Sequence, residues 1–226
     1  RDLVRSRGLG DVYKRQLPRT AGHAAGAENF RTIATYCKEI GLEYLTVYAF
    51  STENWKRPDE EVSAIMGLLR KYLLEAIGRM ERDRVKMHFF GDLSPLSEEL
   101  RVLCMETEEI SKRYEGCQVN ICLNYGGRDE ILRAARAFSR DCAEGKSDPN
   151  HLTEEQFSHY LFSAGVPDPD LVIRPSGEVR ISNFLLWQSA YAEFYFTDVL
   201  WPDFSKEELH RALAAYQSRS RRFGGV

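Results

Sequence analysis

The chain has 226 residues, enough for one domain of ordinary size with a substantial buried core. Its formal net charge of −3 lacks the basic excess typical of nucleic-acid-binding proteins, so we expect no nucleic-acid partner. No apolar run approaches the roughly 20 residues that cross a bilayer, and no signal-peptide core lies near the start. We therefore expect a cytoplasmic protein, which could still touch a membrane surface.

Residues 1–16 have no helix or strand period and do not begin with Met. They differ from the rest of the chain, and we expect an extraneous or disordered segment in place of a native start. The domain itself is expected over residues 17–226.

Helical and strand-like patterns alternate from Leu17 onward. This alternation favours a single α/β domain with a mainly parallel central sheet flanked by helices. Helices are predicted over about 24–38, 59–83 and 97–114, after residues 124–128, and from capping boxes at Thr153 with Gln156 and at Ser205 with Glu208. Strands are predicted over 44–50, 85–90, 118–123 and 171–173.

The cysteines are odd in number and have neither zinc-site nor redox spacing. Free thiols in a reducing compartment are therefore expected. The five are Cys37, Cys104, Cys117, Cys122 and Cys142.

Three loops follow predicted strands, over residues 51–58, 124–128 and 175–182. In parallel α/β sheets, ligands bind beyond the carboxyl ends of the strands. We therefore expect these loops to gather at one rim.

The third loop carries Arg174 and Arg180 on either side of a flexible Ser176-Gly177 turn. Guanidinium groups placed in this way can converge on one multivalent anion, because their planar forks of donors match phosphate oxygens in pairs. Ser182 adds a neutral donor nearby. The alternative is that these arginines form ordinary surface salt bridges.

Glu193 follows an apolar run, where a lone carboxylate is costly unless it pairs or holds a metal ion. Together with the arginine loop it predicts a diphosphate site with a magnesium ligand close by. The alternative is a carboxylate that pairs with a buried arginine.

The first loop offers hydroxyls, an amide, an aromatic ring and cations. The alternative for this loop is a polar turn in which Thr52 or Asp59 caps the following helix. Its candidate residues are Ser51, Thr52, Glu53, Asn54, Trp55 and Arg57.

Arg19 and His23 precede the first predicted helix. A helix N-terminus attracts phosphate through its unpaired amides and its dipole. A purely structural histidine is the alternative for His23. Near the end of the chain, Arg222 and Gly224 belong either to a functional motif or to a basic tail.

Longer motifs carry a family resemblance from Leu17 to the C-terminus. They resemble the cis-prenyltransferase family, most closely the bacterial undecaprenyl diphosphate synthases. The motifs are Leu17-Pro-Arg-Thr-Ala-Gly-His23, Ala49-Phe-Ser-Thr-Glu-Asn-Trp55, Asn124-Tyr-Gly-Gly-Arg128, Arg174-x-Ser-Gly-Glu-x-Arg-Ile-Ser-Asn183, Leu200-Trp-Pro-Asp-Phe204 and Arg221-Arg-Phe-Gly-Gly225.

The resemblance implies a transferase that adds isopentenyl diphosphate in cis to an allylic diphosphate such as farnesyl diphosphate. The product would be a long polyprenyl diphosphate, the precursor of a lipid carrier for peptidoglycan. The resemblance also implies Mg²⁺ as cofactor, a homodimer, a parallel sheet with a hydrophobic tunnel for the growing chain, and possible peripheral membrane contact for product release.

The resemblance further implies roles for individual residues. Asn54 would take part in proton removal and Glu193 would bind Mg²⁺. Contacts to isopentenyl diphosphate would come from Arg174, Arg180 and Ser182, with Ile181 among the substrate-binding residues. Contacts to the allylic diphosphate would come from Arg19, His23 and Arg57. The substrate site would be lined by Ser51, Thr52, Glu53 and Trp55. Arg222 and Gly224 would reach the site of the partner subunit.

The chain departs from the family at its start. The family's first strand normally ends in Asp-Gly-Asn-Gly-Arg-Trp-Ala, which supplies an aspartate for Mg²⁺ and a turn for the allylic diphosphate. Here Ser6 stands in the place of that aspartate, and the native first strand looks replaced. Pro175 also stands where a small residue such as Thr is usual, which removes one N–H donor. We therefore expect an active native synthase but an impaired enzyme in the chain as printed.

Other protein classes remain as alternatives. A non-catalytic accessory subunit of a heteromeric cis-prenyltransferase would keep the fold, although the joint presence of Asn54, Arg57, Arg174, Arg180 and Glu193 argues against it. A generic phosphoryl-transfer enzyme lacks support because no Walker-type Gly-x-x-x-x-Gly-Lys-Ser/Thr occurs. A trans-type prenyl synthase would need Asp-Asp-x-x-Asp, which is also missing.

Overall fold

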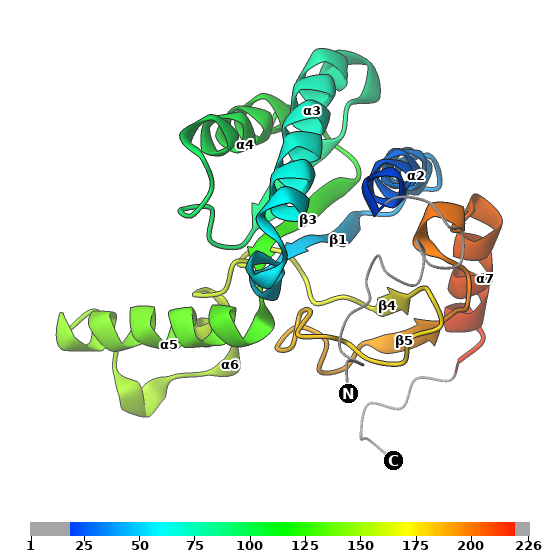
Figure 1. Ribbon diagram of the computed structural model, residues 1–226. Helices are drawn as coiled ribbons and strands as arrows, with labels where there is room; N and C mark the ends of the chain where they lie inside the picture. Colours follow the sequence, from blue (N-terminus) through cyan, green and yellow to red (C-terminus); the bar gives the residue numbers. More distant parts are fainter. Residues whose placement is uncertain (1–18, 220–226) are drawn as a thin grey trace. The chain divides into compact units, whose positions relative to one another are not determined.

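The computed structural model describes residues 19–219, which form two compact units (Figure 1). The central unit consists of Cys37–Asp168 and Ser182–Ala190. The terminal unit takes its residues from the two ends of the chain and from Pro169–Ile181. Every strand pair in both units is parallel, so the predicted α/β fold with a parallel sheet flanked by helices is confirmed, with the strands divided between two sheets.

The sheet of the central unit has the order β1-β3-β2, formed by β1 (Tyr44–Ser51), β3 (Gln118–Tyr125) and β2 (Lys86–Phe90). β3 is buried from its second residue to its last, because it has a neighbour on each side. Among the strands that the structure describes, β1 pairs with β3 alone, and most of its residues are half-buried or exposed. Parallel neighbours need long crossovers, and the helices between the strands supply them.

Helix α3 (Asp59–Asp83) has the predicted bounds and ends at Arg84, which adopts a left-handed conformation. The apolar residues along the helical period of α3 are only partly covered. Val62, Leu73 and Met80 are buried, whereas Ile65, Met66, Leu69 and Ile77 are half-buried. Part of an apolar stripe on α3 therefore remains accessible.

Helix α4 (Glu98–Ser111) lies beside α3 (Figure 1) and also packs against β2. The side chain of Ser97 caps its start by accepting a hydrogen bond from the Leu100 amide. On the side facing β2, Glu108 accepts hydrogen bonds from the Phe89 amide at 2.7 Å and pairs with His88 Nδ1 at 2.6 Å. These contacts fix α4 against the strand.

Helix α5 (Gly127–Ala143) runs beside the short helix α6 (Glu154–Ser158), with the turn η2 (Pro149–His151) between them (Figure 1). The predicted capping box of Thr153 and Gln156 is confirmed. Near the start of α5, the fully buried Glu130 accepts hydrogen bonds from Tyr125 Oη at 2.6 Å, the Phe162 amide at 2.8 Å and Gln188 Nε2 at 3.1 Å. This carboxylate ties three segments of the central unit together.

The terminal unit contains a parallel pair, β4 (Leu171–Arg174) and β5 (Glu193–Phe196), with α7 (Lys206–Gln217) packed against β5 (Figure 1). Ser205 caps α7 as predicted. The carboxylate of Glu208 accepts hydrogen bonds from Tyr195 Oη at 3.1 Å and Thr197 Oγ1 at 2.7 Å. Glu208 therefore anchors α7 to β5.

Helix α2 (Arg19–Glu39) begins before its predicted start near residue 24. Its Asn29 donates to the carbonyls of Trp201 at 2.6 Å and Phe204 at 3.0 Å, in and just after the short helix η3 (Trp201–Asp203). The Trp201 indole donates in return to the Gly26 carbonyl at 2.8 Å. We call this set of hydrogen bonds the α2–η3 clamp.

The five cysteines are free thiols, as predicted. Burial raises the pKa of Cys37 and of Cys104 to about 12, and that of Cys117 to about 11. Because the thiolate is the reactive form, these buried side chains are inert at neutral pH.

None of the helices within the described residues is long and apolar enough to cross a membrane.

Candidate active site

The loop that follows β1 forms a short helix, η1 (Thr52–Lys56). Asn54 Oδ1 accepts a hydrogen bond from the Ser51 amide at 2.9 Å, which fixes the orientation of the Asn54 side chain. The residue before α3 is Pro58, and no side chain caps the helix. The alternative in which Thr52 or Asp59 caps α3 is therefore wrong.

Trp55 connects this loop to the loop after β3. Its indole N–H donates to Asn124 Oδ1 at 2.7 Å, and its ring packs edge-on against Phe50 with centroids 5.1 Å apart. Asn124 Nδ2 in turn donates to the Asp92 carbonyl at 2.6 Å. The ends of β1, β2 and β3 are thus joined by a short chain of side-chain hydrogen bonds.

Asn183 brings a further segment to the same place. Its Nδ2 donates to Glu53 Oε1 at 2.8 Å, and its Oδ1 accepts from the Arg128 amide at 2.9 Å. Its carbonyl accepts from the Gly127 amide at 2.8 Å. The sequence interpretation gave Asn183 no role. The available signal was its position at the end of the Arg-rich motif, and its left-handed φ of 64° suits asparagine.

Gly126 allows these segments to approach closely. A Cβ atom at Gly126 would lie 2.7 Å from Thr52 Oγ1 and 2.8 Å from Asn183 Nδ2. Of the three loops predicted to gather, those after β1 and β3 meet, and Asn183, which follows the third loop, joins them; the gathering of residues 175–181 with them stays a prediction. We call this set of contacts in the central unit the loop junction.

Arg57 follows η1 and pairs with Glu61 in the first turn of α3, at 2.6 Å between Nη1 and Oε1. The two side chains are 24% and 12% exposed, so this ion pair is largely shielded from water. The carboxylate of Glu61 in α3 therefore fixes the Arg57 side chain at the end of the loop that follows β1.

In the terminal unit, Arg174 and Arg180 converge on one atom. Arg174 Nη2 lies 2.6 Å from Glu178 Oε2, and Arg180 Nη2 pairs with the same oxygen. The spacing of the two arginines predicted convergence on an anion, and the anion present is a carboxylate of their own loop. In the structure both arginines form salt bridges within the protein, as the alternative interpretation expected. Their role in ligand binding stays a proposal.

The turn between the arginines is fixed by its backbone. Ser176 and Gly177 have φ values of 75° and 69°. Their amides donate to the carbonyls of Val199 at 2.8 Å and Thr197 at 2.9 Å. These amides therefore hold the turn against the segment after β5, and Pro175 beside them has no amide hydrogen to add.

Glu193, the predicted magnesium ligand, is the first residue of β5 and pairs with Arg219. Arg219 also donates to the Phe194 carbonyl at 2.9 Å. Among the described side chains, no group of three His, Cys, Asp or Glu residues could hold a metal ion. Mg²⁺ is often bound by one or two carboxylates together with substrate phosphates, so Glu193 fits as a single ligand shared with a substrate and not as a preformed metal site.

The four predicted residues near the chain ends have different outcomes. Arg19 and His23 were expected to precede the first helix, but both lie within α2, where the alanines after Arg19 favour the helix although two glycines stand among them. The ring of His23 is half-buried. Arg222 and Gly224 lie outside the described residues.

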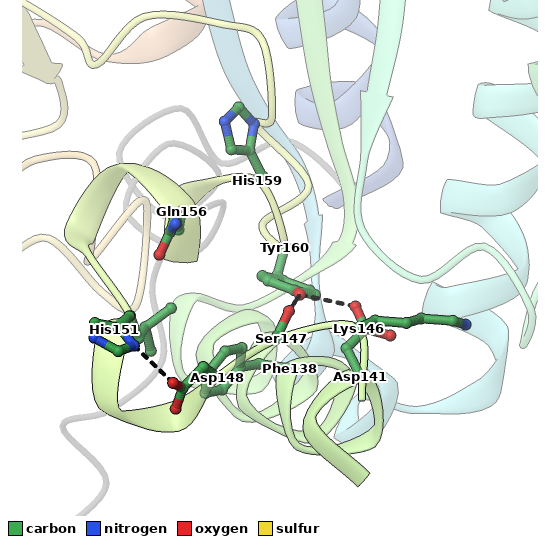
Figure 2. Close-up of a pocket in the computed structure, with 10 residues that line it drawn as sticks. Phe138, Asp141, Lys146, Ser147, Asp148, His151, Gln156, His159 and Tyr160 are labelled. Carbon is green, nitrogen blue, oxygen red and sulfur yellow. Dashed lines mark hydrogen bonds and ion pairs between the residues drawn. The ribbon is translucent and has the colours of Figure 1, made fainter. Parts of the chain in front are cut away.

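The central unit also has a cavity of about 500 Å³ near the C-terminal end of α5 (Figure 2), and its described lining includes none of the predicted site residues. Polar groups along its wall bond to one another. Tyr160 Oη donates to Asp141 Oδ2 at 2.8 Å, and His151 Nδ1 lies 2.6 Å from Asp148 Oδ2 (Figure 2). We assign this cavity no part in the candidate site.

A family model described as putative undecaprenyl diphosphate synthase matches residues 12–224. The chain belongs to the cis-prenyltransferase family. This cis-prenyltransferase is 48% identical to an isoprenyl transferase of Clostridium tetani over 213 residues, which cover 94% of this chain and 84% of the relative. It is 47% identical to an isoprenyl transferase of Brucella suis over 212 residues, with the same two coverages.

Solved structures agree with this membership. Lavandulyl diphosphate synthase from Lavandula x intermedia, solved in complex with dimethylallyl diphosphate, aligns with a TM-score of 0.92 at 32% identity, over 96% of this chain and 94% of that chain. A probable undecaprenyl diphosphate synthase from Campylobacter jejuni aligns with a TM-score of 0.78 at 36% identity, over 89% and 93%. The cis-prenyltransferase is therefore an enzyme of a family that uses isoprenoid diphosphates.

Proposed function

We propose that this enzyme condenses isopentenyl diphosphate with an allylic diphosphate of the farnesyl type, in successive cis additions. The product would be a long polyprenyl diphosphate of the undecaprenyl kind, a precursor of the peptidoglycan lipid carrier. The observation that carries the proposal is the convergence of Arg174 and Arg180 on one anionic oxygen. Paired guanidinium groups are the side chains best suited to a diphosphate.

In this proposal, the arginine loop holds isopentenyl diphosphate. Arg174 and Arg180 bind its phosphate oxygens, Ser182 adds a hydroxyl, and Ile181 contacts the substrate. Holding the diphosphate orients the double bond for attack on the allylic carbon, which converts a bimolecular step into one between positioned groups.

We assign the binding of the allylic substrate to the other predicted residues. Arg19, His23 and Arg57 would bind its diphosphate, while Ser51, Thr52, Glu53 and Trp55 would line its site. Cleavage of the allylic C–O bond leaves a cation and a diphosphate, and nearby guanidinium charge stabilises that leaving group as charge develops.

Asn54 is assigned a part in removing the proton that is lost after the new C–C bond forms. Its orientation is set by the hydrogen bond from the Ser51 amide, so the amide group would be positioned before substrate arrives. Arg222 and Gly224 are proposed to reach the site of a partner subunit in a homodimer.

Glu193 is proposed to hold Mg²⁺ together with substrate phosphate oxygens. When bound, the ion would neutralise charge on the departing diphosphate. Arg219 now pairs with this carboxylate, so the two cations would compete for Glu193.

The growing isoprenoid needs an apolar channel, and the half-covered stripe of Ile65, Met66, Leu69 and Ile77 on α3 supports one. Each methylene buried there would contribute about 0.8 kcal/mol, so chain growth into an apolar channel is favourable. Cytoplasmic synthesis with release at a membrane surface would suit such a product.

The proposal is tested by incubating the purified chain with farnesyl diphosphate, labelled isopentenyl diphosphate and Mg²⁺, followed by chromatography of the polyprenols. The Arg174→Gln variant should lose turnover, whereas Arg70→Gln should keep it. Arg70 is a matched control because its Nε lies 2.6 Å from Glu99 Oε1 in an exposed pair. Equal turnover of both variants would count against the arginine site.

We also propose that turnover of the printed chain is slow, because Asp-Gly-Asn-Gly does not occur in it. A form with that motif restored ahead of Leu17 should be faster by at least an order of magnitude, since a missing metal ligand and phosphate turn could cost several kcal/mol. Comparable rates would refute the impairment. A chain that binds neither Mg²⁺ nor isopentenyl diphosphate, yet stabilises another subunit, would instead favour an accessory role.

A further inference from the structure

Glu178 lies between two cations of the same loop. Its Oε2 atom is 2.6 Å from Arg174 Nη2 and also pairs with Arg180 Nη2. The side chains of Glu178 and Arg174 are only 14% and 16% exposed, whereas that of Arg180 is 46% exposed. Water therefore screens the Arg174–Glu178 contact much less than it would a surface ion pair.

The backbone determines this placement of Glu178. The two left-handed residues before it, Ser176 and Gly177, are held by hydrogen bonds to the carbonyls of Val199 and Thr197. A Cβ atom at Gly177 would lie 2.7 Å from Asp198 Oδ1, so the turn packs closely against this segment. The carboxylate is thus presented to the arginines by a fixed turn.

A single carboxylate oxygen is a poor match for two guanidinium groups. Each guanidinium can donate two parallel hydrogen bonds to a carboxylate or phosphate, and here both share one acceptor atom. A diphosphate offers more oxygens and more negative charge. It could satisfy both arginines, but its charge would repel a carboxylate that remained in place.

We propose that Glu178 is an internal counter-anion, which holds Arg174 and Arg180 in position until a diphosphate displaces it. This inference rests on the proposed diphosphate site and adds a regulatory step to it. The carboxylate keeps the two cations together in the free enzyme. It also makes binding of any anion less favourable, because the anion must replace two ion pairs. Diphosphate, with more oxygens and more negative charge, can replace them better than inorganic phosphate can.

The Glu178→Gln variant tests the displacement step. Glutamine keeps an acceptor oxygen for the arginines but removes the charge that an incoming anion must displace. We expect inorganic pyrophosphate to bind this variant more tightly than the wild type, on the order of tenfold or about 1.4 kcal/mol, because it no longer has to displace a charged carboxylate. Inorganic phosphate should gain more affinity than pyrophosphate does, so the preference for pyrophosphate should narrow.

The measurement is calorimetric titration of the full chain with pyrophosphate and with phosphate at constant ionic strength. Glu99→Gln is the matched control, because Glu99 also pairs with an arginine at 2.6 Å but on the surface of α4, and it should bind as the wild type does. Arg174→Gln should abolish binding in every background, which places the probe at this loop.

The outcomes separate the two claims. If the wild type does not bind pyrophosphate, the proposed diphosphate site fails and this inference fails with it. If the wild type binds but Glu178→Gln binds equally or more weakly, only the counter-anion role is overturned.

Glu178→Asp separates charge from side-chain length, and thermal unfolding of each variant verifies that it is folded. Aspartate keeps the negative charge on a shorter side chain. The pyrophosphate affinity of the Glu178→Asp variant should therefore stay closer to that of the wild type than the affinity of Glu178→Gln does. If the Asp and Gln variants gained the same affinity for pyrophosphate, the length of the side chain would matter and its charge would not. That result would also overturn the proposal.

Discussion

The indole of Trp55 donates a hydrogen bond to Asn124 Oδ1 across 2.7 Å, which joins the loop after β1 to the loop after β3. Asn124 is almost fully buried and has a left-handed φ of 46°. A residue here must tolerate that backbone conformation and also offer both an acceptor and a donor. Asparagine meets all three requirements, since its short amide side chain often occupies the left-handed region.

Substitution of Asn124 separates these requirements. Asn124→Ala should lower the free energy of unfolding by about 3 kcal/mol, since it loses two buried hydrogen bonds and keeps the left-handed backbone. Asn124→Gly loses the same bonds but relaxes the backbone, so it should be more stable than the alanine variant by about 1 kcal/mol. Urea unfolding measures both. An alanine variant as stable as glycine would show that the backbone conformation carries no cost.

Gly126→Ala should disturb the loop junction without unfolding the protein. The added methyl group would meet Thr52 Oγ1 and Asn183 Nδ2 at under 3 Å, and must push the two loops apart. Displacement of positioned groups by about 1 Å can reduce turnover roughly 100-fold, so a loss of that order in kcat/KM is expected.

The matched control for Gly126→Ala is Gly78→Ala in α3, where a Cβ atom meets nothing within 4 Å. That variant should keep its activity and gain up to about 1 kcal/mol of stability, because alanine favours the helix. Equal activity of the two alanine variants would contradict the proposed importance of the loop junction.

Glu130→Ala should be among the most destabilising changes in the central unit. It leaves the Tyr125 hydroxyl, the Phe162 amide and the Gln188 side chain without their shared acceptor. Burial, followed by the nearby Glu130 charge, raises the pKa of Tyr125 far above its usual range, so its hydroxyl stays a donor. We expect a loss of about 3 kcal/mol, against about 1 kcal/mol for Tyr125→Phe. Chemical denaturation with an unchanged m-value provides the test, and a loss below that of Tyr125→Phe would contradict it.

The Glu108 carboxylate should make stability depend on pH. Burial opposes its charge, but hydrogen bonds from His88 and the Phe89 amide, with a smaller effect of Lys112, lower its pKa overall. A lowered folded-state pKa stabilises the protein above the unfolded value of about 4.3, and this stability is lost as pH falls through the folded value.

Glu108→Gln should therefore be less stable than the wild type by about 1 kcal/mol at pH 7. It should approach wild-type stability only as the pH falls through the lowered pKa of Glu108, where the native carboxyl is itself protonated. Thermal unfolding across this range measures the difference. A gap that stays constant from pH 7 to pH 3 would show that the charge of Glu108 is not involved.

Local patterns predicted the long elements of the fold. The bounds of α3 follow from a sustained helical period between Pro58 and the end of the pattern, and the structure has the same bounds. Strand β5 was not predicted, because four residues of an apolar, aromatic-rich run give no period that distinguishes strand from helix. The early start of α2 was missed because its first turns lack an apolar stripe.

The sequence indicated which residues form the candidate site, but not which side chains they contact. The spacing of Arg174 and Arg180 predicted that they converge, but their shared partner Glu178 depends on two left-handed residues before it. The contacts of Asn183 likewise depend on the backbone at Ser182 and Asn183, where φ is 53° and 64°. Sequence patterns seldom indicate such conformations for residues other than glycine.

The α2–η3 clamp has a consequence for the order of events during synthesis. Asn29 and Gly26 leave the ribosome long before their partners Trp201 and Phe204, which are separated from them by 172 to 175 residues. All residues of the central unit, by contrast, have been translated once Ala190 is added. We therefore expect the middle of the polypeptide to acquire its tertiary contacts first, while α2, although made before it, is among the last elements to be secured.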